Sequence, residues 1–270
     1  MNELEGKLVK NQWIRPEELI AAKEEQRKTR KSIFACLIKL GYMSEEDIFI
    51  FFAETSQIPF VRLADYAIQE DILKLLPEAF CRDNLVMPLW IIEQEVFVVM
   101  ADPLDAETVK SINHQIPYTV HYLIANPSAI RKNLDKYFGP KDNFFKIEEY
   151  ICKPAGLQEF PFQRESERIS IFVPLEFKLD DKRVMFHSPS YIPATMLNIS
   201  KSGTAAGIKT CAFLPSGVNL LLNFSSFAPK PKEAEACVVY CRLEEKGKFY
   251  MGIKFLGLDQ DTIIRLLESK

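Results

Sequence analysis

The chain has 270 residues, of which 47% are hydrophobic and 26% are charged, as in globular proteins with more than one folded domain. The formal net charge of -3 excludes a global positive field, so we expect no binding to nucleic-acid polymers, and any nucleotide site must depend on local arginines. No apolar stretch approaches the ~18 residues of a membrane span. The first residues also lack the layout of a signal peptide, so we expect a cytoplasmic protein.

The first sixty residues contain an internal repeat with a period of 29 residues, in which Leu8-Val9 recurs as Leu37-Ile38. Each copy has the pattern of a helix, a turn and a second helix. Pro16 suits the first turn of one of these second helices, and Ser44 with Asp47 resembles a capping box at the start of the other. The repeat predicts a small helical subdomain built from two related hairpins.

From about residue 58, strand-like runs alternate with segments of helical period, which indicates a compact α/β unit. The predicted strands are Leu85–Ile92, Val96–Ala101 and Tyr118–Ile124, and the predicted helices are Gln69–Leu76, Ala106–His114 and Ser128–Phe138. Pro88 lacks the N–H that a central strand needs, so we expect it either in an edge strand or at the end of a strand.

The last third of the chain is β-rich and follows a segment with several prolines and glycines and no sustained period. The predicted strands there are Ile169–Phe177, Arg183–His187, Thr195–Ile199, Ala205–Phe213, Val218–Phe224, Ala236–Leu243 and Tyr250–Leu256, followed by a helix over Asp259–Glu268. We therefore predict an α+β multidomain chain: a helical subdomain over 1–57, a small α/β unit over 58–138, a linker over 139–163, and an antiparallel β-barrel with a terminal helix over 164–270.

Two short patterns frame the first half of the predicted barrel. Arg164-Glu-Ser-Glu-Arg168 precedes the first strand, and Asn198-Ile-Ser200-Lys-Ser-Gly203 leaves the third. They resemble the R-x-x-x-R and [D/N]-x-S-x-x-G motifs of the PilZ family. The resemblance implies a receptor for the bacterial second messenger cyclic di-GMP, with Arg164, Arg168, Asn198, Ser200 and Gly203 as the ligand-binding residues.

The chemistry of these residues suits such a ligand, which carries two phosphates and two guanines. An arginine fork donates in parallel to phosphate oxygens or to guanine O6 and N7, and its flat face stacks on a base. An asparagine offers a carbonyl and an amide to a guanine edge, and a glycine permits close approach of the backbone. The alternative interpretation is that the two arginines are solvated linker charges and that residues 198–203 form a polar turn.

Residues 3–138 resemble a second family, the MshEN or GspE N-terminal domain of type II secretion and type IV pilus assembly ATPases. The repeat carries this resemblance, together with Ile58-Pro59-Phe60-Val61, Leu76-Pro77, Pro88-Leu89 and Met100-Ala101-Asp102-Pro103. In some members the repeat itself binds cyclic di-GMP through an arginine and glycines. Those positions are degraded in this chain: the arginine position holds Glu3 and Ser32, and the first glycine position holds Glu5 and Phe34. The next glycine is replaced by Gln12 in the first copy but is kept as Gly41 in the second. No second nucleotide site is therefore expected here.

Catalysis is not expected. The sequence has no G-x-x-x-x-G-K-[ST] loop for ATP and no nucleophile motif, and His114, His121 and His187 do not have metal-ligand spacing. The six scattered cysteines are interpreted as thiols rather than disulfides or metal ligands. The combined resemblances imply that a barrel senses cyclic di-GMP and that the N-terminal domain contacts a protein partner in a secretion, pilus or motility apparatus. The alternative is an adaptor that binds its partner regardless of nucleotide.

Overall fold

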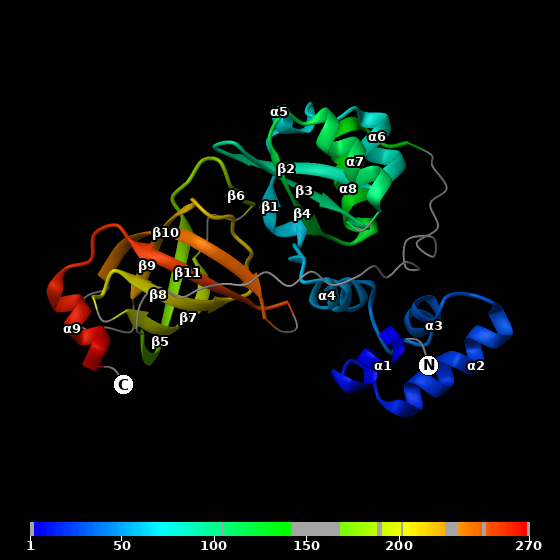
Figure 1. Cartoon of the computed structure of the whole chain (residues 1–270), viewed down its shortest axis with the longest axis horizontal. Helices are drawn as coiled ribbons and strands as arrows, with labels where there is room; N and C mark the ends of the chain where they lie inside the picture. The colour runs from blue at the N-terminus through cyan, green and yellow to red at the C-terminus, as the bar shows by residue number, and fades with distance from the viewer. Residues whose placement is uncertain are drawn as a thin grey trace. The chain divides into compact units, whose positions relative to one another are not determined.

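The computed structural model describes residues 3–103, 105–141, 168–187, 191–200, 202–224, 232–244 and 247–268, which form two compact units (Figure 1). The described part of the first unit comes from residues 3–63, 70–89 and 96–141. The second unit contains the described residues from 168 onward, together with the short segments 64–69 and 90–95.

The first unit begins with the helical repeat. Its helices are α1 (Glu3–Lys10), α2 (Pro16–Thr29), α3 (Ile33–Lys39) and α4 (Glu45–Ser56). The turns after α1 and α3 are equivalent, because Gln12 and Gly41 both have a left-handed backbone, with φ of 57° and 71°. The predicted capping box is confirmed, since the backbone N–H of Asp47 donates to Ser44 Oγ at 3.1 Å and that of Ser44 donates to Asp47 Oδ2 at 2.8 Å.

An α/β part completes the first unit. Its helices are α5 (Glu70–Leu73), α6 (Glu78–Asn84), α7 (Ala106–Gln115) and α8 (Pro127–Phe138), and its sheet has the order β2 (Val86–Ile92), β3 (Glu95–Met100), β4 (Thr119–Ile124). Pro88 lies in an edge strand, as predicted. The helix predicted over Gln69–Leu76 is shorter than expected, because Pro77 disfavours helical backbone in the residue before it and is itself the N-cap of α6.

The second unit is a closed six-stranded antiparallel barrel with the order β10-β11-β8-β7-β5-β9 (Figure 1), as the fold-class prediction required. Its elements are β5 (Arg168–Leu179), β7 (Ile192–Ser200), β8 (Ala205–Thr210), β9 (Asn219–Phe224), β10 (Lys232–Leu243), β11 (Phe249–Phe255) and the terminal helix α9 (Gln260–Glu268). Side chains at alternate positions of β5, such as Val173, Leu175 and Phe177, are buried, as a barrel with a filled interior requires.

The strand predicted over Arg183–His187 is wrong in extent and in place. Only Met185–Phe186 (β6) is extended, and it pairs with Tyr66–Ala67 (β1), which directly follows the short 3-10 helix η1 (Leu63–Asp65), instead of joining the barrel. This pairing joins segments that are more than a hundred residues apart, so local sequence patterns do not reveal it.

An aromatic cluster fixes β1 within the second unit. The hydroxyl of the buried Tyr66 donates to the carbonyl oxygen of Phe213 at 2.7 Å. The ring of Trp90 lies 5.0 Å from that of Tyr66 and stacks on that of Phe213 at 6.4 Å, and Phe213 in turn meets Phe249 of β11 edge to face at 5.7 Å. These rings stabilise the unit by burying apolar area around one satisfied hydroxyl.

Within the described ranges, no helix is both long enough and apolar enough to cross a membrane. The same residues contain no group of three His, Cys, Asp or Glu side chains that could hold a metal ion. Of the cysteines described, Cys36 and Cys81 are buried and Cys211 is exposed, and none forms a disulfide.

Candidate functional site

The two motifs meet on the outer face of the barrel. Arg168 begins β5 and lies opposite Ser200 at the end of β7. Its Nη1 donates to Asn198 Oδ1 at 2.8 Å, so side chains thirty residues apart in the sequence are in direct contact. Arg164, the other arginine of the first motif, lies outside the described residues.

Tyr250 of β11 is the third member of this cluster. Its hydroxyl oxygen accepts a hydrogen bond of 2.8 Å from Asn198 Nδ2 and one of 3.3 Å from Arg168 Nη1. Both the carbonyl and the amide of Asn198 therefore form hydrogen bonds with protein groups. Asn198 holds Arg168 and Tyr250 in place in this arrangement.

Ser200 and Gly203 shape the turn after β7. The Ser200 side chain is buried, and its Oγ accepts a hydrogen bond of 3.1 Å from the backbone N–H of Ala205. Gly203 donates its N–H to the Ser200 carbonyl at 2.8 Å and has a φ of 68°, which favours glycine. These two residues set the direction in which the chain leaves Asn198 and enters β8.

Two strand glycines make room for the tyrosines of the site. Asn198 lies opposite Gly207 of β8, Gly207 opposite Gly252 of β11, and Gly252 opposite Tyr240 of β10. A Cβ on Gly207 would overlap the Tyr250 hydroxyl and lie 2.8 Å from Asn198 Oδ1, and a Cβ on Gly252 would overlap the Tyr240 ring. The absent side chains therefore allow a continuous polar and aromatic row across four strands.

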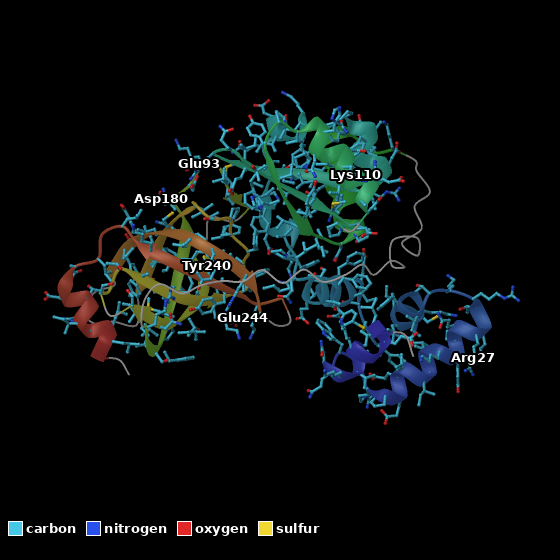
Figure 2. All side chains as sticks on the ribbon, viewed as in Figure 1. Arg27, Glu93, Lys110, Asp180, Tyr240 and Glu244 are labelled. Atoms are coloured by element: carbon cyan, nitrogen blue, oxygen red, sulfur yellow. The ribbon has the colours of Figure 1, made fainter. Side chains whose placement is uncertain are left out.

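Arg242 completes the outer face and lies on β10, the strand that also carries Tyr240 (labelled in Figure 2). Its guanidinium carbon lies 4.9 Å from the centroid of the Tyr250 ring, and the Tyr240 and Tyr250 rings stack at 6.1 Å. Within the part of the chain that the structure describes, neither Arg168 nor Arg242 pairs with a carboxylate. Two guanidinium groups thus converge on one tyrosine, which favours an anionic ligand.

The charges of this face act on Tyr240. Burial raises the pKa of its hydroxyl, and the neighbouring Tyr250 raises it further, whereas the positive charges of Arg168 and Arg242 lower it. The pKa remains above the ordinary value, so Tyr240 keeps its proton at neutral pH.

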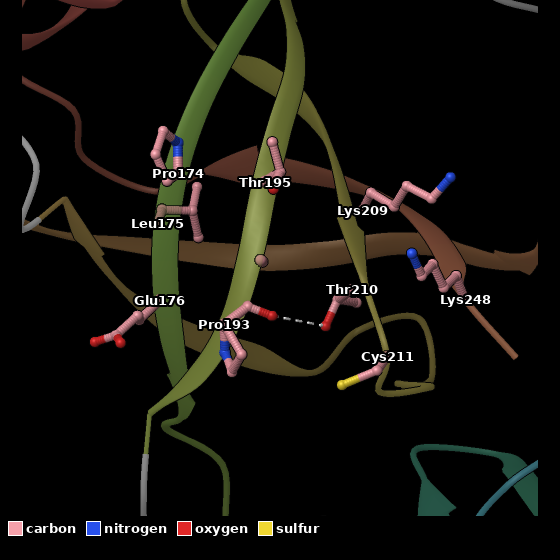
Figure 3. A pocket seen from close by; sticks show the side chains of 10 residues that line it. Pro174, Leu175, Glu176, Pro193, Thr195, Lys209, Thr210, Cys211 and Lys248 are labelled. Atoms are coloured by element: carbon pink, nitrogen blue, oxygen red, sulfur yellow. Dashed lines mark hydrogen bonds between the residues drawn. The ribbon is translucent and has the colours of Figure 1, made fainter.

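A groove of about 530 Å³ opens on the same barrel, over β5, β7 and β8 (Figure 3). Its floor includes Pro174 and Pro193, and Lys209 and Lys248 extend on one side of it, away from the Glu176 carboxylate (Figure 3). The volume suits a small molecule. However, Lys209 Nζ lies 3.2 Å from a carboxylate oxygen of Glu244, so the positive charge of this side is partly neutralised.

The degraded positions of the N-terminal repeat have structural roles. The Ser32 hydroxyl accepts a hydrogen bond of 3.1 Å from the backbone N–H of Ala35 and caps α3. Phe34 is buried and meets Phe52 edge to face at 4.9 Å, and Glu5 forms an ion pair of 2.8 Å with Lys23. These three side chains are therefore engaged in contacts within the helical repeat.

Sequence reasoning missed Tyr250, Tyr240, Arg242, Gly207 and Gly252. One signal was present, because a glycine inside a predicted strand marks a place where another group approaches the backbone closely. Alternation along the strands also puts Tyr250 with Gly252, and Tyr240 with Arg242, on the outer face. The pairing of the strands, which brings these residues beside Asn198, could not be read from either signal.

Comparison with known proteins finds two domain families in the chain. Residues 56–143 match the MshEN domain, and residues 162–269 match the PilZ domain. Both families named from the residues are therefore confirmed. Arg164, Arg168 and Asn198 all fall within the PilZ match.

Individual relatives match the N-terminal half. The type IV pilus assembly ATPase PilB of Myxococcus xanthus (strain DK1622) is 28% identical over 134 residues, which are 50% of this chain and 24% of that protein. This chain thus spans about a quarter of the length of that relative. A structure of MshE with cdg is 25% identical with a TM-score of 0.44, covering 51% of this chain and 99% of that one. The N-terminal domain of XpsE is 18% identical with a TM-score of 0.37, covering 50% and 92%.

Proposed function

We propose that this chain, which joins an MshEN domain to a PilZ domain, is a non-enzymatic cytoplasmic receptor that binds cyclic di-GMP on the outer face of its barrel. The ligand-binding residues in this proposal are Arg164, Arg168 and Asn198, with Ser200 and Gly203 holding the turn that positions Asn198. The ligand itself is the only small molecule required, and no cofactor or metal takes part.

One observation carries the proposal. Arg168 and Asn198, which belong to different motifs, are joined by a hydrogen bond of 2.8 Å, and Arg168 has no carboxylate partner in the described part of the chain. An arginine that is held in place but not neutralised is prepared to bind an anion, because little conformational entropy remains to be lost on binding. A solvated linker charge would have neither property.

The shape of the ligand fits this face. Each phosphate of cyclic di-GMP can accept two parallel hydrogen bonds from an arginine, and each guanine has a flat surface that stacks on a guanidinium or an aromatic ring. Tyr240, whose ring stacks with that of Tyr250 at 6.1 Å, adds an aromatic surface on the same face. The face therefore offers separate groups for the charged and the planar parts of the dinucleotide.

The proposed output is a protein contact made by the MshEN domain with a component of a secretion, type IV pilus or motility apparatus. The likeness of the N-terminal half to a type IV pilus assembly ATPase supports this choice of partner. Because the match covers only part of that ATPase, this step is an inference from a shared domain.

Isothermal titration of cyclic di-GMP into the full chain tests the proposed site. Arg168→Ala is expected to weaken binding at least ten-fold, since a hydrogen bond to a charged group contributes ~1.5–3 kcal/mol. Arg27→Ala, which removes an exposed arginine of α2 (Figure 2), is the matched control and should bind as the unchanged chain does. If the unchanged chain bound no cyclic di-GMP, the nucleotide-independent adaptor would replace the receptor.

A further inference from the structure

Arg242 lies outside both motifs but is part of the same face. Its side chain is exposed on β10, whereas the Tyr250 ring beneath it is only 4% exposed. The guanidinium carbon lies 4.9 Å from the centroid of that ring, which is within the distance of a cation–π contact. Because the Arg242 side chain is exposed, a ligand can reach it.

We propose that Arg242 is a further ligand-binding residue, which holds a guanine of the dinucleotide by stacking between that base and solvent-shielded Tyr250. This inference rests on the proposed function and assigns the base, as distinct from the phosphate, to a residue. In the proposed stack the guanidinium of Arg242 lies between the Tyr250 ring and the purine ring of the ligand. The in-plane N–H groups of Arg242 remain free to donate to guanine O6 and N7.

The chemistry requires an arginine at this position. A guanidinium is planar and weakly hydrated, so both of its faces can be covered while its edge still donates hydrogen bonds. An ammonium is a strongly hydrated point charge with no flat face. Lysine at residue 242 would preserve the charge but lose the stacking platform.

Tyr250 links Arg242 to the motif residues. Its hydroxyl oxygen accepts hydrogen bonds from Arg168 and Asn198, and its ring carries Arg242. The buried ring therefore fixes the groups proposed for phosphate and for base relative to each other. A ligand that has both parts in one molecule gains affinity from this arrangement, because both of its contacts are preorganised.

The groove over β5, β7 and β8 is the competing place for the base. Its Lys209 already pairs with Glu244, and its Glu176 carboxylate would repel the phosphates that are joined to the base. Arg242 has no such partner among the residues described. The charges therefore favour binding of the ligand beside Arg242 on β10 over binding in the groove.

Titration of cyclic di-GMP into full-length variants tests the assignment. Arg242→Ala should weaken binding about ten-fold, and Arg242→Lys should recover little of this loss because the stacked plane is missing. Arg265→Ala, at an exposed arginine of α9, and Lys248→Ala, at the groove, should bind as the unchanged chain does. Circular dichroism checks that each variant is folded.

The outcomes separate the two proposals. Unchanged affinity of Arg242→Ala, alongside binding by the unchanged chain, would overturn the role of Arg242 and leave the receptor intact. A loss in Lys248→Ala with none in Arg242→Ala would move the base to the groove. If the unchanged chain did not bind, the receptor and this inference would both be wrong.

Discussion

Gly207→Ala perturbs the centre of the proposed site without removing any functional group. The new methyl group would overlap the Tyr250 hydroxyl and lie 2.8 Å from Asn198 Oδ1. Because Tyr250 is only 4% exposed, it has little free space into which to move. The substitution should therefore displace Tyr250 and break its hydrogen bonds with Arg168 and Asn198.

The expected cost follows from these contacts. Overpacking of a buried site costs ~1–3 kcal/mol. Each of the two hydrogen bonds to the Tyr250 hydroxyl contributes ~0.5–1.5 kcal/mol. Because these contributions are not additive for groups in contact, we expect the free energy of unfolding to fall by about 2–4 kcal/mol. Cyclic di-GMP affinity should fall about ten-fold as Arg168 loses its fixed position.

Guanidinium denaturation followed by circular dichroism measures the first effect, and calorimetric titration measures the second. Gly257→Ala is the matched control, because a Cβ on Gly257 would meet no atom within 4 Å. If Gly207→Ala unfolded at the same denaturant concentration as Gly257→Ala and bound the ligand equally well, Tyr250 would not be the residue that organises this face.

Two further predictions concern the rest of the molecule. Burial by itself raises the pKa of the Asp181 carboxyl, but hydrogen bonds from Arg183 and backbone N–H groups outweigh it, so the pKa lies below its ordinary value of 3.8. The stability that this carboxylate contributes is therefore present above pH ~4 and is lost as the pH falls through the lower, native pKa. At pH 7 the free energy of unfolding of Asp181→Asn should be ~1–3 kcal/mol lower than that of the unchanged chain. The stability of this variant should also depend less on acid in denaturation curves. Asp180→Asn, at an exposed neighbour, is the control and should be as stable as the unchanged chain at pH 7. Alkylation of the native protein at pH 8, mapped by mass spectrometry, should modify the exposed Cys211 and spare Cys81, because burial raises the pKa of the Cys81 thiol to about 12; equal labelling of both would contradict this.

Local signals in the sequence were sufficient for the elements that depend on local chemistry. The capping box of Ser44 formed as predicted, since it depends on residues within a few positions. Pro88 placed β2 at a sheet edge for the same reason: a proline cannot donate to a neighbouring strand. The domain boundaries remain a prediction.

Local signals failed where distant segments meet. Tyr66 pairs with Phe186, and no local pattern indicates that the predicted strand near residue 185 would leave the barrel for a partner so far away. The candidate site shows the same limit. Arg168 and Asn198 could be proposed from their motifs, but Tyr250 became recognisable only when strand pairing brought it into contact with both.

A crystal structure of the full chain with cyclic di-GMP tests the central claim most directly. The account predicts the dinucleotide on the outer face of the barrel, with a phosphate within hydrogen-bond distance of Arg168 and a guanine stacked on Arg242. A ligand bound instead at the N-terminal repeat, or a barrel face left empty at saturating ligand, would contradict it.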